Sequence, residues 1–244
     1  SCGAVILLVD ITEKEKREKL RREFTANVSH ELKTPLTSIC GISDMLMNGI
    51  VKPEDVKGFG GDINREAARL LALVNDIIRL SELDEGAEDT EKAEITDILE
   101  VANDAVKSIS GVAKKAGITV TAEGNSTLVN GGKSLIFEMI YNLCDNAVKY
   151  NRENGSVKVC VGSAGGSAFI RVSDTGIGIA PEHIDRIFER FYRVDKSRSK
   201  QSGGTGLGLS IVKHIALSLG GKISTESKPG YGTEITVSLP IAEK

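Results

Sequence analysis

The sequence predicts an α+β protein in which an antiparallel helical hairpin precedes an α/β sandwich, and two observations predict this order. Over residues 12–83, apolar side chains recur at three- and four-residue spacing, as on helices that bury one face. From residue 95 to residue 239, helical segments alternate with short strands and glycine-rich turns. Between them lies an acidic stretch with little periodicity that contains Gly86. We therefore predict a helical domain at 13–86 and a second domain at 87–244.

Composition limits the classes of protein to which the chain can belong. Its 244 residues suffice for one large domain or two small ones, and 40% hydrophobic residues can form a core. A net charge of −3 gives no basic surface, so nucleic acid is not expected as a partner. The cysteines have neither CxxC pairs nor metal-ligand spacing, which predicts reduced thiols that pack or lie at the surface: Cys2, Cys40, Cys144 and Cys160.

The first residues indicate a piece of a longer protein. The longest apolar run, residues 4–9, is far shorter than the roughly 18 residues of a membrane-spanning helix, so we expect a soluble chain. The run ends in Asp10-Ile11-Thr12, which resembles the last strand of PAS sensory domains; a stray strand is the alternative. Residues 1–12 are thus predicted to be the end of a preceding PAS-like domain or a linker.

One long helix is predicted from about Thr12 to Met47. Residues 13–22 are dense in Lys, Arg and Glu, as on a solvated helix face, and no helix-breaking residue separates them from the segment around His30. Pro35 lacks an N–H and clashes with the preceding turn, so it should bend this helix a few residues after His30.

His30 lies on the side of the predicted helix that faces away from the core. At about 100° per residue it falls roughly 160° from the middle of the apolar stripe, with Thr34 and Thr37 beside it and Glu31 on the flank. A lone helical histidine is usually a solvated or capping residue. An imidazole followed at once by a carboxylate, and one turn later by a hydroxyl, instead indicates chemistry. The stripe consists of Phe24, Val28, Leu32, Pro35, Ile39, Ile42 and Leu46.

A second helix is predicted after a C-cap signal at Asn48-Gly49 and a start signal at residues 52–54. Three glycines near its start each cost about 1 kcal/mol relative to alanine, so the helix should begin late, fray or kink there. A hairpin of two helices cannot enclose its own apolar seam, so two copies are expected to form a four-helix bundle. The glycines are Gly58, Gly60 and Gly61, and the apolar positions are Val56, Phe59, Ile63, Ala67, Leu70, Val74 and Ile77.

The second domain is predicted to alternate helices and strands. Helices are expected at 95–116, at 133–151 and from the glycine-rich residues 203–210 to Leu219. Strands are expected at 117–122, 127–129, 156–162, 167–173 and 234–239.

Polar side chains recur every four residues along the helix predicted at 133–151, where Glu138, Asn142, Asn146 and Tyr150 share a face that borders the core. Asparagine oxygens can hold Mg²⁺, which takes its other ligands from water and substrate phosphates. A row of this kind is more often a plain solvated face.

Glycine-rich segments provide the second chemical signal. The glycines of the segment 174–181 (DTGIGIAP) would let its backbone approach a ligand closely. The segment does not fit the GxGxxG fingerprint of dinucleotide-binding proteins, because the third glycine would fall on Pro181. The segment 203–210 opens a helix, and N–H groups at a helix start attract anions such as a triphosphate. Between them, residues 194–203 are expected to form a mobile lid; a plain disordered loop is the alternative.

These motifs together resemble one family. Residues 29–37 (SHELKTPLT) resemble the phosphoacceptor box of sensor histidine kinases. The asparagine row, residues 174–181 and residues 187–193 (IFERFYR) resemble the family's N, G1 and F boxes, and the glycine-rich residues 203–210 follow in the family's order. The resemblance extends from about Thr12 to Leu239. It is to the cytoplasmic catalytic core of a bacterial two-component sensor similar to phosphate-regulon sensors, with an ATP-binding domain of the gyrase/chaperone/histidine-kinase type.

The resemblance implies a function and its residues. ATP would phosphorylate His30, Glu31 would take or hold the proton, and the phosphoryl group would pass to an aspartate of a response regulator. Thr34 would orient a water for phosphatase activity toward that regulator, and Asn146 and Asn142 would hold Mg²⁺. The implied ATP-binding residues are Asn142, Asn146, Lys149, Tyr150, Asp174, Gly176, Gly178, Arg193, Thr205, Gly206, Leu207 and Gly208.

The same resemblance implies the oligomeric state, the partner and the cellular location of the protein. It predicts a homodimer that acts on a response regulator receiver domain, in the cytoplasmic portion of a membrane-anchored bacterial sensor whose membrane link lies in segments before this chain. Two alternatives remain open. A plain ATPase of the same superfamily would use Glu138 as the base for water, and an inactive scaffold would be expected to have lost part of the asparagine or glycine set.

Overall fold

The computed structural model describes residues 11–84, 94–194 and 204–242. The predicted PAS-like strand, most of the acidic boundary and nearly all of the predicted lid lie outside these residues. The chain forms two compact units, Ser1–Leu71 and Ala72–Lys244. The second unit therefore includes the C-terminal part of the second long helix. We describe each unit by itself.

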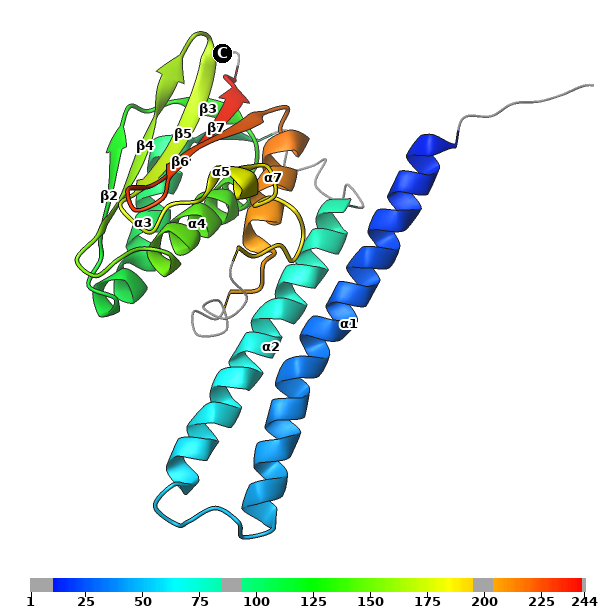
Figure 1. The fold of residues 1–244 in the computed structure, drawn as a ribbon. Coiled ribbons are helices and arrows are strands. Elements are labelled where there is room, and N and C mark those ends of the chain that lie inside the picture. The colour runs from blue at the N-terminus through cyan, green and yellow to red at the C-terminus, as the bar shows by residue number, and fades with distance from the viewer. Residues whose placement is uncertain (1–10, 85–93, 195–203, 243–244) are drawn as a thin grey trace, which may run out of the picture. The chain divides into compact units, whose positions relative to one another are not determined.

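The first unit contains the helix α1 (Thr12–Met47) and the first half of α2 (Val56–Asp84), shown in blue and cyan in Figure 1. The predicted bounds of α1 are confirmed, with Pro35 inside the helix. Asn48 caps its C-terminus and Gly49 follows with φ 65°, a left-handed conformation that glycine adopts without a steric penalty. α2 starts at Val56, after a turn at residues 53–55, and Gly58, Gly60 and Gly61 lie inside the helix and do not delay its start.

The second unit is an α/β sandwich. Its main sheet has the strand order β2-β4-β5-β7-β6, in which only the β2–β4 pair is parallel. A two-stranded antiparallel sheet, β1–β3, lies outside it. The strands are β1 (Ile95–Asp97), β2 (Thr119–Gly124), β3 (Leu128–Asn130), β4 (Ser156–Ala164), β5 (Ser167–Asp174), β6 (Lys222–Lys228) and β7 (Gly232–Pro240).

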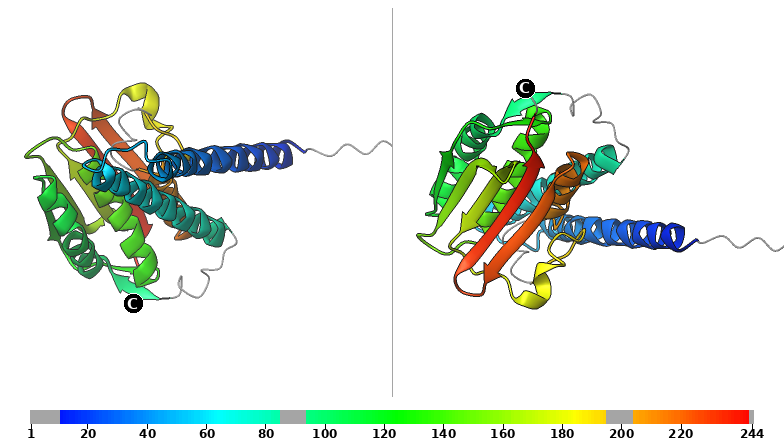
Figure 2. Two further views of the ribbon diagram at one scale, coloured as in Figure 1. Left: turned by 90° about the horizontal axis from the view of Figure 1, so that it is seen from below. Right: turned by 90° about the horizontal axis from the view of Figure 1, so that it is seen from above.

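Three helices cover one face of the main sheet (Figures 1 and 2): α3 (Ile98–Lys115), α4 (Lys133–Lys149) and α7 (Gly208–Ser218). A short helix, α5 (Pro181–Ile184), follows β5. Apolar side chains from the helices and from the central strands are fully buried between the two layers, which fixes the faces of α4 and α7. This core includes Ile98, Ile109, Leu135, Ile136, Met139, Ile140, Ile170, Ile211, Ile215 and Val237. The predicted order of a helical hairpin followed by an α/β sandwich is confirmed.

The predicted helix at 95–116 begins three residues too early. Ile95–Asp97 instead forms β1, which pairs with β3. Asp97 is the reason, because its Oδ1 accepts a hydrogen bond of 2.9 Å from the Leu99 N–H and caps the helix that starts at Ile98. The strand β6 was not predicted, since its sequence KISTESK has a single apolar residue and it forms a polar edge of the sheet.

Among the residues that the structure describes, none of the helices has the length and apolar character needed to cross a bilayer. The cysteines within those residues carry free thiols: Cys40 is exposed, Cys160 is partly exposed and Cys144 is buried. Burial raises the pKa of Cys144 to about 12, so this thiol stays protonated and acts as a packing residue.

Candidate functional site

In the first unit, His30 projects into solvent from α1, with 79% of its side chain exposed. Its Nδ1 lies 3.7 Å from Oε1 of Glu31. The other oxygen of this carboxylate lies 3.7 Å from the guanidinium of Arg69 on α2, whose side chain is only 14% exposed. Because Glu31 approaches the Nδ1 side of the ring, Nε2 is the nitrogen left for an incoming electrophile.

Thr34 lies one turn after His30, as predicted, and is exposed. Its hydroxyl donates to the His30 carbonyl at 3.2 Å. Thr37 makes the same kind of bond to the Lys33 carbonyl at 2.8 Å. Both hydroxyl oxygens keep lone pairs that can accept a hydrogen bond from a bound water.

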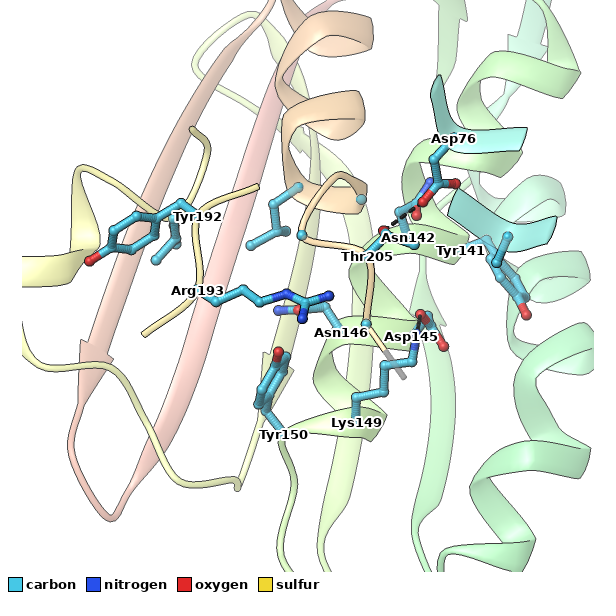
Figure 3. A pocket seen from close by; sticks show the side chains of 16 residues that line it. Asp76, Tyr141, Asn142, Asp145, Asn146, Lys149, Tyr150, Tyr192, Arg193 and Thr205 are labelled. Atoms are coloured by element: carbon cyan, nitrogen blue, oxygen red, sulfur yellow. Dashed lines mark hydrogen bonds and ion pairs between the residues drawn. The ribbon is translucent and has the colours of Figure 1, made fainter. Parts of the chain in front are cut away.

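The second unit contains two adjoining cavities, of about 300 and 310 Å³, between α4, the start of α7 and the segment after β5. We refer to the two together as the cleft, because they share the lining residues Asn146, Tyr150, Ile187, Tyr192, Arg193 and Leu209. One end is largely apolar and contains Asp174. The other end is polar and is drawn in Figure 3.

At the apolar end, two backbone N–H groups hold the carboxylate of Asp174 in position. Its Oδ1 accepts from the N–H of Gly176 at 2.7 Å and from the N–H of Thr233 at 3.2 Å. Burial raises the pKa of Asp174 above its ordinary value, and these two hydrogen bonds partly oppose the shift. Since both donors contact Oδ1, Oδ2 remains available for a donor on a ligand. Ile177, Ile179 and Val194 line the same cavity as Asp174 and would pack against a flat aromatic ring.

Glycines allow the backbone to pack closely at this end. Gly178 has φ 69°, and a Cβ there would lie 2.1 Å from the Lys228 carbonyl oxygen. A Cβ at Gly176 would lie 2.3 Å from the Tyr150 carbonyl oxygen. Any side chain at either position would therefore displace the loop that holds Asp174. Gly178 lines the cleft, whereas Gly176 supports it from outside.

At the polar end, the predicted asparagine row of α4 does line the cleft. Asn142 donates its amide N–H to the Glu138 carbonyl at 3.0 Å, and its Oδ1 is directed toward Gly208. Lys149 forms an ion pair of 2.6 Å with Asp145, and both side chains border the cavity. Figure 3 shows the guanidinium of Arg193 pointing into the same space.

The start of α7 closes the polar end. Thr205, Gly206 and Gly208 line the cavity, while Leu207 is fully buried beneath it. Gly206 has φ 77°, and a Cβ at Gly208 would lie 2.9 Å from Oδ1 of Asn142. Backbone N–H groups at this helix start attract negative charge, as phosphate groups require.

The donor set at the polar end fits Mg²⁺ as part of a nucleotide complex. Among the described residues, no group of three or more His, Cys, Asp or Glu side chains could hold a metal ion. Of the oxygen donors that border this cavity, the carboxylate of Asp145 is paired with Lys149 and that of Asp76 accepts from Thr205. The amide oxygens of Asn142 and Asn146 suit a hard cation that takes its remaining ligands from phosphates and water. A metal would therefore be held here together with the nucleotide.

Glu138 shares the helical face of the asparagines but does not line the cleft. Its Oε2 accepts from Nε of Arg79 at 2.7 Å. Burial raises the pKa of Glu138, and the guanidinium opposes that shift. This carboxylate is thus held by a cation, outside the cavity where a base for water would act.

Several residues that line the cleft were not predicted from the sequence. Tyr141, Asp145, Tyr192 and Leu209 lie next to predicted positions, so their motifs could have indicated them. Asp76 had no such signal, because it lies on α2, within the segment assigned to the helical hairpin. Its Oδ2 accepts a hydrogen bond of 2.6 Å from the Thr205 hydroxyl (Figure 3).

Two protein families match the chain. Residues 20–86 match the family described as His Kinase A (phospho-acceptor) domain. Residues 131–243 match the family described as histidine kinase-, DNA gyrase B- and HSP90-like ATPase. The first match contains the exposed histidine and the second contains most of the cleft.

Curated relatives match over nearly the whole chain. The sensor-like histidine kinase SenX3 of Mycolicibacterium smegmatis is 38% identical over 97% of this chain and 62% of its own length. The sensor protein kinase WalK of Staphylococcus haemolyticus is 36% identical over 98% of this chain and 40% of its own length. The chain therefore spans between two fifths and two thirds of these relatives.

Solved structures share the fold. The Acinetobacter baumannii histidine kinase AdeS has a TM-score of 0.71 and 25% identity, over 88% of this chain and 98% of that chain. The histidine kinase ThkA, in complex with the response regulator protein TrrA, has a TM-score of 0.71 and 24% identity, over 96% of this chain and 68% of that chain.

Proposed function

Since this chain belongs to the sensor histidine kinases of bacterial two-component systems, we propose that it transfers the γ-phosphoryl group of ATP to His30 and then to an aspartate of a response regulator. The observation that carries this proposal is a cleft with a buried carboxylate at one end and a glycine-rich helix start at the other. These are the recognition groups for the two ends of ATP. An exposed imidazole in the same chain supplies the phosphoryl acceptor.

We propose that each end of the cleft recognises one part of ATP. Oδ2 of Asp174 accepts from the amino group of adenine, and the apolar side chains around it pack against the ring. Lys149, Arg193 and the N–H groups at the start of α7 neutralise the phosphates. Asn142 and Asn146 contribute oxygen ligands to Mg²⁺, which supplies charge neutralisation on the phosphates when bound.

In the proposed transfer, Nε2 of His30 attacks the γ-phosphorus, a P–N bond forms, and the P–O bond to ADP breaks with its electron pair on the departing oxygen. The ring becomes cationic as it loses electron density. Glu31, which faces Nδ1, then stabilises that charge or takes the Nδ1 proton. Phosphotransfer to a receiver-domain aspartate then breaks the same P–N bond. The solved structure of ThkA is a complex with a response regulator, and we propose the same class of partner here.

The alternative of a plain ATPase is less well supported. It requires Glu138 to activate water, but this carboxylate is paired with Arg79 at 2.7 Å and does not border the cleft. It also gives no function to the exposed His30–Glu31 pair. An inactive scaffold is equally disfavoured, since the asparagine and glycine residues that line the cleft are retained. The setting we propose is the cytoplasmic part of a membrane-anchored sensor.

Glu31 and Thr34 are expected to serve different steps. Glu31→Gln should lower autophosphorylation by about 10²-fold or more, because general-base assistance is typically worth 10²–10⁴-fold. Thr34→Ala should keep autophosphorylation within about threefold but lose dephosphorylation of the phosphorylated regulator, since its hydroxyl can orient water but cannot take a proton at neutral pH. Both rates are measured on the same preparation.

Thr37→Ala is the matched control for Thr34→Ala. Thr37 makes the same bond to the carbonyl four residues back, so its loss reproduces any effect on the helix backbone. We expect both activities to survive it. If Thr34→Ala lowers both activities together, Thr34 only supports the helix near Pro35.

We also propose that the chain is a homodimer through α1 and α2. Leu71, Val74 and Ile78 are large, exposed apolar residues at three- and four-residue spacing on α2. An exposed stripe of this kind marks an interface.

Light scattering at micromolar concentration should give the mass of a dimer, and Leu71→Glu should give a monomer. Leu217→Glu, at a similarly exposed leucine on α7, should leave the dimer intact; a monomeric wild-type chain refutes this proposal.

A further inference from the structure

Asp76 is a carboxylate in the polar part of the cleft, where the other carboxylate, Asp145, is paired with Lys149. It lies on α2, in the stretch of that helix that belongs to the second compact unit. It lines the polar cavity together with Lys149, Asn142 and the start of α7. Figure 3 shows its side chain directed at Thr205. Burial raises the pKa of Asp76, and the hydrogen bond from Thr205 opposes the shift.

The donor capacity of the Thr205 hydroxyl is used up by this contact. It has one proton, which it donates to Oδ2 of Asp76 at 2.6 Å. Its oxygen accepts from the N–H of Leu207 at 3.2 Å, at the start of α7. The hydroxyl therefore cannot donate to a phosphate oxygen while it is bonded to Asp76. The carboxylate itself supplies negative charge near the helix start, which would otherwise favour a phosphate.

The two ends of the cleft give a bound nucleotide a direction. A nucleotide with its base against Asp174 would direct its phosphate chain toward the cavity that contains Thr205 and Asp76, and the third phosphate would reach furthest. That group would both compete for the Thr205 proton and bring negative charge toward the Asp76 carboxylate. The first two phosphates would lie nearer the residues that border both cavities, such as Asn146 and Arg193.

The α2 segment has contacts besides the one made by Asp76. Arg79 donates to Glu138 at 2.7 Å, and Arg190 donates to both oxygens of Asp84 at 2.7 and 3.0 Å. His214 lies 3.4 Å from the same carboxylate. These side chains all lie outside the residues that border the cleft. A substitution at Asp76 should therefore leave the segment in place.

We propose that Asp76 is a specificity-determining residue that makes the nucleotide site distinguish ATP from ADP. Its carboxylate holds the Thr205 hydroxyl and opposes a terminal phosphate, so ATP must displace it whereas ADP leaves the contact intact. This inference rests on the proposed function of the cleft as an ATP site. It assigns to α2 a direct part in sensing the third phosphate.

The test is calorimetric titration of the full chain with Mg²⁺ and either ADP or a non-hydrolysable ATP analogue. Asp76→Asn removes the charge with little change of shape, and Asp76→Ala also removes the acceptor of the Thr205 bond. Both should raise affinity for the analogue by about tenfold, because a like charge near the terminal phosphate is removed. Affinity for ADP should change by less than about twofold. Asp104→Asn, an equal charge change at a partly exposed residue of α3 that pairs with Lys133, should change neither affinity.

The outcomes separate this inference from the proposed function. If the wild-type chain binds ADP but the ratio of the two affinities is unchanged in both Asp76 variants, the inference is wrong and the nucleotide site stands. Weaker binding of the analogue by the variants also overturns it, because Asp76 would then support the third phosphate. If the wild-type chain binds neither nucleotide, the proposed function fails and the inference fails with it.

Discussion

Asp174→Asn is expected to abolish nucleotide binding while leaving the fold intact. Oδ1 of Asp174 takes both backbone N–H donors, from Gly176 and Thr233, and the amide oxygen of asparagine can take the same two bonds. The atom replaced is then Oδ2. An NH₂ group there presents donors to the amino group of adenine in place of an acceptor, which leaves buried polar groups unpaired. We expect affinity for ATP to fall by about 10²-fold or more.

Titration calorimetry measures this loss, and circular dichroism with thermal unfolding verifies the fold. Asp104→Asn on α3 is the matched control, because it makes the same chemical change at a residue outside the cleft. The affinity of the Asp104→Asn variant for ATP should equal that of the wild-type chain. Unchanged affinity in Asp174→Asn would mean that adenine is recognised elsewhere.

His30→Gln is expected to eliminate phosphorylation of the chain. Glutamine has a similar size and remains polar at this exposed position, so α1 should be unaffected. Its amide nitrogen has a delocalised lone pair and cannot replace Nε2 as the nucleophile. Incorporation of label from γ-labelled ATP should fall to background, while nucleotide affinity stays at the wild-type value because the cleft does not include His30.

His214→Gln is the control for this variant. His214 lies on α7, where its Nδ1 is 3.4 Å from Asp84, and its side chain is mostly buried. We expect the label incorporated by the His214→Gln variant to stay within a few fold of the wild-type level. If the His30 variant still incorporates label, another side chain accepts the phosphoryl group.

Local signals in the sequence were sufficient for most of the fold. The 3.6-residue period and the Asn48-Gly49 cap predicted the bounds of α1 correctly, since neither depends on distant residues. The strand β1, just before α3, could not be obtained in this way. The Asp97 cap sets the first helical residue at Ile98, but that Ile95–Asp97 forms a strand follows from its pairing with β3, some thirty residues on. The polar strand β6 likewise exists because β7 pairs with it.

The residues of the site show the same difference between local patterns, which the sequence reveals, and contacts between distant positions, which it does not. Asn142, Asn146 and Tyr150 recur every four residues, so helical spacing alone predicted that they share a face, and all three border the cleft. The contact between Asp76 and Thr205 joins positions 129 residues apart and follows no local pattern. The pairing of Glu138 with Arg79, 59 residues away, is of the same kind. The sequence therefore indicated the binding groups, while the structure was needed to identify the charges that oppose or neutralise them.

The chemical stability of the label on the phosphorylated wild-type chain decides whether a histidine is the phosphoryl acceptor, and the His30→Gln variant decides which one. After incubation with Mg²⁺ and γ-labelled ATP, the label should be lost in acid and retained in base, because the P–N bond of a phosphohistidine hydrolyses when the ring is protonated. ATP labelled at the α-position should leave no label on the protein. Label that survives acid, or a chain that binds ATP without being labelled, would contradict the assignment of His30.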